Sequence, residues 1–250
     1  MKNAPPPVHI LDLPVHPVDM DSALATIDGF IGGRTPRHIV TADASMLVMA
    51  QEDADLREII LNADLITPDS VGIVWAARRQ GSTLSGRVSG VEIVENLCAL
   101  SATHGYRIYF LGAAPGVAEK AAERMRGRYP GAQIIGTRDG FFGESEVAGI
   151  VEAICVLKPD ILCVAMGIPK QEKWIAKHRD KLQVPVMIGV GGTLDVLSGM
   201  VRRAPRLMQR AHLEWLWRVL SNPRKINKVL LLPRFVVLVR RAKAASKVPG

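Results

Sequence analysis

The sequence predicts an α/β protein: a mainly parallel, Rossmann-like sheet with helices on both faces, followed by a basic helical C-terminal appendage. Short apolar runs of strand length alternate with segments of helical periodicity through residues 8–200, which is typical of βαβ units. The 250 residues are 48% hydrophobic, enough to bury a core without disulfides or metal. Beyond residue 200 the pattern changes to basic helical segments, which indicates a separate appendage.

Each expected strand is a short apolar run that a helical segment follows. We expect strands at residues 37–41, 65–67, 107–111, 133–136, 161–166 and 184–190. Helical periodicity predicts helices near residues 20–32, 44–50, 54–63, 71–80, 90–103, 115–128, 144–157 and 170–182. In such parallel sheets, ligands bind beyond the carboxyl ends of the strands, so candidate site residues are sought directly after each strand.

Charge divides the chain into an α/β domain at residues 1–200 and an appendage at residues 201–250. The appendage holds 13 Lys or Arg and one acid, Glu214, for a net charge of +12. The other 200 residues hold 19 basic and 23 acidic side chains, for a net charge of −4. Such an appendage indicates a localised anionic partner, either phospholipid or nucleic acid. Because Trp215, Trp217 and Phe235 lie among leucines, we expect an interfacial helix on an anionic membrane surface, and no nucleic acid partner.

We expect no targeting or spanning segment in this chain. Its start, with prolines at positions 5–7, lacks the apolar run and cleavage site of a signal peptide. The best spanning candidate, 229–239, is interrupted by Pro233 and Arg234, and the three cysteines lie far apart in apolar runs, which is typical of reduced core thiols. We therefore expect a cytoplasmic protein that is peripheral to a membrane.

Two candidate sites follow the first two strands of the sheet. Thr41 and Asp43 end one strand, and Asp69 ends the next. In one interpretation these residues cap the helices that follow, Asp43 or Thr41 after the first strand and Asp69 after the second. In the other, they project a hydroxyl and a carboxylate toward one ligand. The second arrangement is what a general base needs to deprotonate an acceptor alcohol.

Three further candidates follow later strands. Gly112 opens a turn whose backbone N–H groups suit a phosphate or a ribose, although a tight turn explains it equally well. Lys170, Gln171 and Glu172 open a helix where a simple cap would favour Asp, Ser or Thr, so this pattern slightly favours a functional role. Asp195 follows a glycine-rich strand end and is suited to a ribose or base contact, or to capping.

No metal site is predicted. The Asp-x-Asp pairs beginning at Asp19 and Asp53 match a metal-binding spacing, but each lies at a helix start and is better explained by capping. The histidines show no ligand spacing. Arginines would then have to neutralise any bound diphosphate.

A series of short motifs follows the strand ends in order along the chain. They are Thr41-x-Asp43, Ala63-Asp64-Leu65 with Pro68-Asp69, Arg87-x-x-Gly90, Phe110-Leu111-Gly112 with Pro115-Gly116, Tyr129-Pro130-Gly131, Asp139-Gly140-Phe141-Phe142, Pro159-Asp160-Ile161-Leu162, Gly167-x-Pro169-Lys170-Gln171-Glu172, Gly189-Val190-Gly191 with Asp195, Arg203-Ala204-Pro205, and Glu214-Trp215-Leu216-Trp217-Arg218. Together they resemble the WecG/TagA/CpsF family of bacterial glycosyltransferases over about residues 8–225. No single motif is specific, but so many in order are.

The resemblance implies inverting, metal-independent transfer of a hexose from a UDP-sugar to an undecaprenyl-diphosphate-linked sugar, with no cofactor. It implies a place in cell-surface polysaccharide synthesis, at the inner face of the bacterial plasma membrane. By the same resemblance, Asp69 is the general base, Thr41 places the donor or acceptor, and Gln171 contacts the sugar. The remaining expected substrate contacts are Arg87, Arg218 and Arg224 at the diphosphate, Asp195 and Gly112 at the nucleoside, and Asp43, Phe141, Lys170 and Glu172.

The chain departs from the family pattern at three places. Asp43 stands where Asn is common, Ser70 where Gly is common, and Phe141 where Tyr is common. The donor therefore stays open among N-acetylmannosamine, its uronate, and glucose or another hexose. Three alternatives also stay open: another nucleotide-dependent Rossmann-like enzyme, a nucleic-acid-binding protein, and an inactive scaffold of a polysaccharide assembly complex. The oligomeric state, including a homo-oligomer, is open as well.

Overall fold

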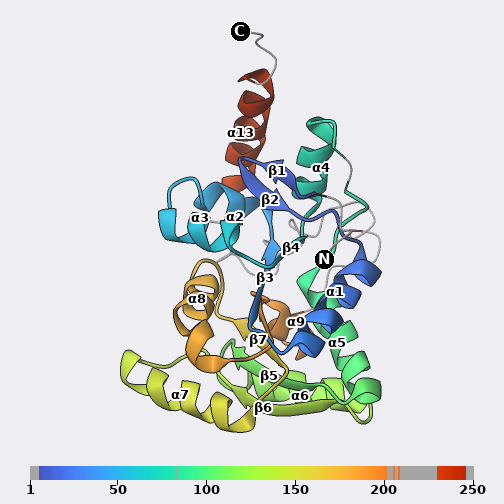
Figure 1. Cartoon of the computed structure of the whole chain (residues 1–250), viewed down its shortest axis with the longest axis vertical. Helices are drawn as coiled ribbons and strands as arrows, with labels where there is room; N and C mark the ends of the chain where they lie inside the picture. Colours follow the sequence, from blue (N-terminus) through green and yellow to red (C-terminus); the bar gives the residue numbers. More distant parts are fainter. Residues whose placement is uncertain (1–5, 83, 202–204, 206–207, 209–229, 246–250) are drawn as a thin grey trace.

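The computed structural model describes residues 6–82, 84–201, 205, 208 and 230–245. Its centre is a six-stranded sheet in the order β4-β3-β8-β7-β5-β6, in which every neighbouring pair is parallel (Figure 1). The strands are β3 (Arg37–Ala42), β4 (Leu65–Pro68), β5 (Arg107–Gly112), β6 (Gln133–Arg138), β7 (Ile161–Ala165) and β8 (Val186–Gly189). The α/β class and all six expected strands are confirmed.

The eight expected helices are also present. They are α1 (Met20–Gly33), α2 (Ala44–Met49), α3 (Ala54–Leu61), α4 (Val71–Arg79), α5 (Gly90–His104), α6 (Val117–Arg128), α7 (Glu144–Leu157) and α8 (Lys170–Leu182). Two features were not predicted. The first is an antiparallel hairpin of β1 (Val8–Ile10) and β2 (Leu13–Val15), and the second is the short helix α9 (Thr193–Leu197).

Helices cover both faces of the sheet, as expected. On one face, Ile39 of β3 and Phe110 of β5 pack with apolar residues of α1, α5, α6 and α9. On the other face, Tyr109 and Leu162 pack against α7 and α8. The hairpin and α2, α3 and α4 cover the β3 and β4 end of the sheet in a third cluster. Alternate residues of one strand thus enter different cores, as the period of two in a strand requires.

The order of the strands predicts a ligand-binding crevice at the carboxyl ends of β5 and β7. From β5 the chain continues outward to β6, whereas from β7 it continues in the opposite direction, to β8 (Figure 1). Where connections diverge in this way, the loops separate and leave room for a ligand. The topology therefore favours binding between the loops that follow β5 and β7.

The first aspartate of each Asp-x-Asp pair caps a helix, as the capping interpretation predicted. The Asp19 carboxylate accepts a hydrogen bond from the backbone N–H of Ser22 at 2.9 Å, at the start of α1. Asp53 accepts from the N–H of Leu56 at 3.0 Å, at the start of α3. Asp53 also forms an ion pair with Lys173 at 2.9 Å. Both Asp-x-Asp pairs thus begin with a capping residue.

One helix of the expected appendage, α13 (Leu231–Ala245), packs on the body of the protein (Figure 1). Its Phe235 and Val239 are buried with residues of α2, and Phe235 lies next to Gly72 of α4. Arg234 forms an ion pair with Glu52. Among the described helices, none combines the length and the apolar character that crossing a membrane requires.

The rest of the expected appendage lies largely outside the described residues. This holds for Arg218, Arg224, Trp215 and Trp217. The domain boundary at residue 200 therefore stays a prediction.

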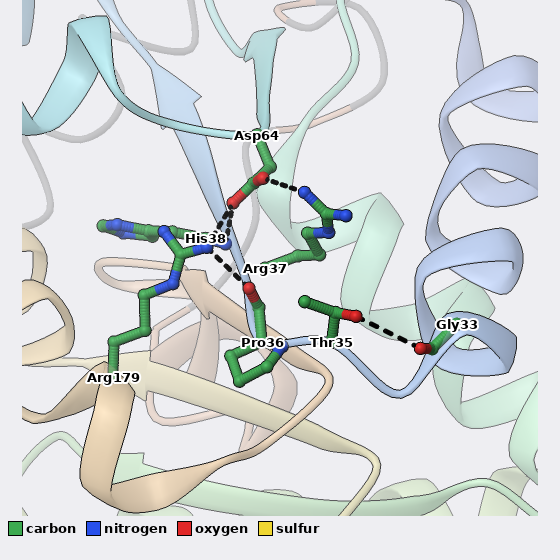
Figure 2. Close-up of polar contacts among 7 residues, drawn as sticks. All are labelled: Gly33, Thr35, Pro36, Arg37, His38, Asp64 and Arg179. Carbon is green, nitrogen blue, oxygen red and sulfur yellow. Dashed lines mark hydrogen bonds and ion pairs between the residues drawn. The ribbon is translucent and has the colours of Figure 1, made fainter.

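At the amino ends of β3 and β4, Asp64 joins three elements (Figure 2). Its carboxylate accepts from Arg37 Nη1 at 2.7 Å and from the backbone N–H of His38 at 2.8 Å, and it pairs with Arg179 of α8 at 3.2 Å. Arg179 also donates to the carbonyl of Pro36 at 2.6 Å. These contacts fasten α8 to the sheet at the edge opposite the candidate site.

Candidate active site

The structure brings the predicted strand-end residues to one edge of the sheet. Along that edge, in strand order, lie Asp69 after β4, Asp43 after β3, Gly191 after β8, Gln171 after β7 and Gly112 at the end of β5. Neighbouring strands are about 4.8 Å apart, so these loops form one continuous rim. The prediction that the candidates share one edge is confirmed, although Asp43 and Gly191 are separated by 148 residues in the chain.

At the β3 and β4 end of this rim, two helix caps hold the backbone around Asp69. Asp43 accepts from the N–H of Met46 at 2.8 Å and so caps α2, as one of its two interpretations predicted. The cap of α4 is Ser70, whose hydroxyl accepts from the N–H of Ile73 at 3.4 Å and from the N–H of Ala44 at 3.2 Å. Because Ser70 supplies the cap, Asp69 does not.

Asp69 is half-buried and its backbone is fixed. Its N–H donates to the carbonyl of Ala42 at 2.8 Å, which extends the pairing of β3 with β4 by one residue. Farther along the chain, the N–H of Val88 donates to the carbonyl of Pro68 at 2.8 Å. A carboxylate on such a rigid corner, partly open to solvent, is suited to accept a proton from a bound hydroxyl.

Thr41 lies deeper than Asp69, on the face of β3 that meets α5. Its hydroxyl donates to the carbonyl of Gly189 at 2.8 Å, and the side chain is buried. It lies against Gly90, the first residue of α5, and Thr193 reaches the same place. Sequence reasoning missed Gly90 and Thr193 as neighbours of Thr41, because their proximity arises only when α5 and α9 pack on this face.

Gln171 ties together the loops after β7 and β8. Its Oε1 accepts from the backbone N–H of Gly167 at 3.1 Å and from that of Gly191 at 2.9 Å. Its Nε2 donates to Glu172 Oε1 at 2.7 Å. Both side chains are fully buried, with exposures of 1% and 0%. At the start of α8, Gln171 therefore holds together two loops of the rim, which a simple helix cap would not do.

On the β5 side of the crevice, the backbone comes unusually close to its neighbours. Gly112 has φ of +120°, and a Cβ built there would lie 2.5 Å from the carbonyl of Ala165. A Cβ at Gly140 would lie 3.2 Å from Gly112 Cα. Only residues without a side chain allow these loops to approach each other, and the N–H groups of Ala113 and Gly140 donate to the carbonyls of Ala165 and Ala113, each at 2.8 Å.

Two aromatic residues follow β6 beside this crevice. Phe141 is 72% exposed, and its N–H donates to the carboxylate of Asp139 at 2.8 Å. The Lys170 ammonium lies 5.7 Å from the centre of the Phe142 ring. An exposed aromatic ring and a cation at the mouth of a crevice are suited to a ring and a phosphate of a ligand.

Arg87 and Asp195 complete the predicted set within the described residues. Arg87 precedes α5, with its side chain 23% exposed, and its Nη2 lies 4.0 Å from Glu92. Asp195 is half-buried in the first turn of α9. Both lie on loops or helices that follow the rim.

A groove lies away from this rim. It has a volume of about 490 Å³ and lies between α3 and α8, lined by His38, Asp55, Glu58, Ile59, Asn62, Ala176, Arg179 and Asp180. Its carboxylates outnumber its one arginine, and that arginine already binds Asp64 and Pro36. Such a lining disfavours a diphosphate, so the rim is the better candidate for a nucleotide-dependent enzyme.

Known proteins are similar to this chain over most of its length. The sequence matches the Glycosyl transferase WecG/TagA/CpsF family over residues 8–248. A protein of Bacillus spizizenii strain W23, named N-acetylglucosaminyldiphosphoundecaprenol N-acetyl-beta-D-mannosaminyltransferase, is 34% identical over 211 residues, which are 84% of this chain and 81% of the relative. A protein of the same name from Staphylococcus aureus strain MW2 is 32% identical over 209 residues, 84% of this chain and 82% of the relative.

Proposed function

Because this chain belongs to the WecG/TagA/CpsF family of glycosyl transferases, we propose that it transfers a hexose from a UDP-sugar to a polyprenyl-diphosphate-linked sugar in cell-surface polysaccharide synthesis. The family match over almost the whole chain carries this proposal. The names of the two relatives favour N-acetylmannosamine as the hexose and N-acetylglucosamine-diphosphoundecaprenol as the acceptor. The uronate of N-acetylmannosamine and glucose are the alternative hexoses.

In the proposed reaction, Asp69 is the general base. Its carboxylate takes the proton of the acceptor hydroxyl while the hydroxyl oxygen forms a bond to the anomeric carbon. The bond from that carbon to the UDP oxygen breaks on the opposite face, and UDP leaves with the electron pair, so the configuration inverts. The fixed backbone of Asp69 supports this role, since a base must be held within hydrogen-bond reach of its proton.

We propose that the donor binds at the carboxyl ends of β5 and β7, where the strand order predicts a crevice. We place the nucleoside near Gly112 and Asp195, with Phe141 beside a ring, and the sugar near Gln171. Arg87, together with Arg218 and Arg224 of the appendage, would neutralise the leaving diphosphate, and Lys170 is a further cation near the crevice. Cationic side chains can supply that charge compensation, so the proposed reaction uses no metal cofactor.

We also propose that α13 contributes to contact with an anionic membrane surface, which would hold the enzyme at the inner face of the plasma membrane near its lipid-linked acceptor. While Phe235 and Val239 face the body, one side of the helix is exposed. The exposed residues of α13 combine apolar with basic side chains, namely Pro233, Arg234, Val237, Arg240, Arg241 and Ala242, and the exposed Leu230 directly precedes the helix. Such a face suits phospholipid headgroups.

Flotation with liposomes tests this contact. We expect Arg240→Glu with Arg241→Glu to weaken binding to vesicles that contain anionic lipid, because each basic side chain near such a surface contributes about 1 kcal/mol. The matched control is Lys120→Glu with Lys181→Glu, which makes the same charge change at exposed positions on α6 and α8. Equal loss of binding in both variants would contradict a role for α13.

Mass spectrometry of reaction products tests the proposed transfer. The purified chain is incubated with a panel of UDP-hexoses and a short prenyl-diphosphate-N-acetylglucosamine acceptor. We expect the acceptor to gain the mass of one N-acetylhexosamine from UDP-N-acetylmannosamine. Gain of a different hexose would correct the donor, and no product from any UDP-hexose would favour the inactive scaffold.

A further inference from the structure

The side chain of Glu172 is a buried acid whose position demands a reason. It lies in the first turn of α8, it is fully buried, and its Oε1 accepts from Gln171 Nε2 at 2.7 Å. Removing a carboxylate from water is costly, and an apolar side chain of similar size often packs there at least as well. The helix N-terminus offsets part of this cost, but it does not explain the contact with Gln171.

The contact fixes which way the Gln171 amide points. Its Oε1 faces two backbone donors, the N–H groups of Gly167 and Gly191. The two ends of a glutamine amide have nearly the same size, so packing alone distinguishes them poorly. Because Glu172 Oε1 accepts from Gln171 Nε2, Glu172 selects the orientation in which Nε2 faces it and Oε1 faces the glycines.

Gly189 makes the room for this pair. A Cβ on Gly189 would lie 2.6 Å from Gln171 Nε2 and 2.6 Å from Glu172 Oε1, closer than real contacts allow. The carbonyl of Gly189 in turn accepts from Thr41. The side chains of Gln171 and Glu172 therefore lie next to Gly189, the last residue of β8, whose carbonyl binds Thr41 of β3.

We propose that Glu172 is a positioning residue: by accepting from Gln171 Nε2, it holds the Gln171 amide so that the loops after β7 and β8 keep the spacing that sugar transfer requires. The inference rests on the proposed function of the rim. It assigns Glu172 to the support of the site, whereas the family resemblance implied a contact with substrate.

Two readouts test the proposal together. We expect Glu172→Leu to lower kcat about 10- to 100-fold, as loss of an orienting partner does elsewhere, with little change in the KM for the acceptor. We expect Glu172→Gln, which keeps an acceptor oxygen, to recover most of that loss. Hydrogen exchange at the amides of Gly167 and Gly191 should accelerate in Glu172→Leu, since Gln171 no longer holds them.

A double variant separates action through Gln171 from an independent role. If Glu172 acts through Gln171, Gln171→Ala with Glu172→Leu loses no more activity than Gln171→Ala alone. Additive losses would overturn the proposal, and so would unchanged exchange at both glycine amides in Glu172→Leu. The control is Glu144→Leu, in the first turn of α7, where the side chain is 82% exposed and bound to Lys177; it should change neither readout.

An exchanged pair covers the case in which Glu172→Leu does not fold. Gln171→Glu alone places two carboxylates together and should accelerate exchange at Gly167 and Gly191. Adding Glu172→Gln restores one donor and one acceptor and should restore protection; failure to do so would overturn the proposal. If the wild-type chain transfers no sugar at all while exchange responds as expected, the proposed function fails and the loop clamp stands.

Discussion

Protonation of His38 should destabilise the fold as the pH falls below neutrality. The side chain is 3% exposed, and burial, reinforced by the nearby Arg179, lowers its pKa from 6.5 to about 4, although Asp64 opposes the shift. Between these values the unfolded chain binds a proton that the folded chain does not. The free energy of unfolding therefore falls as the pH drops through this range, by about 2 kcal/mol between pH 7 and pH 5 and about 3 kcal/mol in full.

Urea denaturation of the wild-type chain and of His38→Gln at pH 7, 6 and 5 measures this effect. Other groups also titrate, so the difference between the two proteins isolates His38. We expect the wild-type chain to lose about 2 kcal/mol more than the variant between pH 7 and pH 5. His104→Gln, at an exposed histidine, should keep the wild-type dependence. Parallel curves for the wild type and His38→Gln would refute the reasoning.

Further predictions concern the rim and α13. Asp69→Asn should lower kcat about 10²- to 10⁴-fold, and single-turnover assays should show the same slowing of transfer. The melting temperature of the variant, measured separately, should not fall. Near-normal turnover would exclude Asp69 as the base. Gly112→Ala should destabilise the fold by about 1–3 kcal/mol in urea, since its Cβ would overlap Ala165, whereas Gly149→Ala, with open space around it inside α7, should be neutral or stabilising. Phe235→Ala should weaken the docking of α13 by about 3–5 kcal/mol, seen as faster hydrogen exchange in that helix; unchanged exchange would show that its packing on α2 contributes little.

The sheet was predictable because each of its strands contains a short run of consecutive apolar residues, from two in β6 to five in β7. Buried parallel strands such as β7 are apolar on both faces, so their signal is strong. The hairpin was not predictable, because its strands have three residues each and its turn places Leu11 and Asp12, rather than glycine or asparagine, in the left-handed region. Helix α9, with five residues, is too short to show a helical period.

The candidate site was predictable in position but not in detail. Parallel strands end at one edge, so residues after the strands had to meet there. The capping role of Asp43 was one of two interpretations that the sequence left open, and the structure shows this cap; a contact of Asp43 with substrate stays a prediction. The clamp of Gln171 joins Gly167 and Gly191, and it depends on the pairing of β7 with β8 and on the space at Gly189. No local pattern reports such a contact.

The anomeric configuration of the product tests the central claim most directly. The wild-type chain and Asp69→Asn are compared with UDP-N-acetylmannosamine and the prenyl-diphosphate acceptor, and the new linkage is examined by NMR. The account predicts a product inverted relative to the donor, formed by the wild-type chain and nearly absent with Asp69→Asn. A product that retains the donor's configuration, or equal amounts from both proteins, would contradict it.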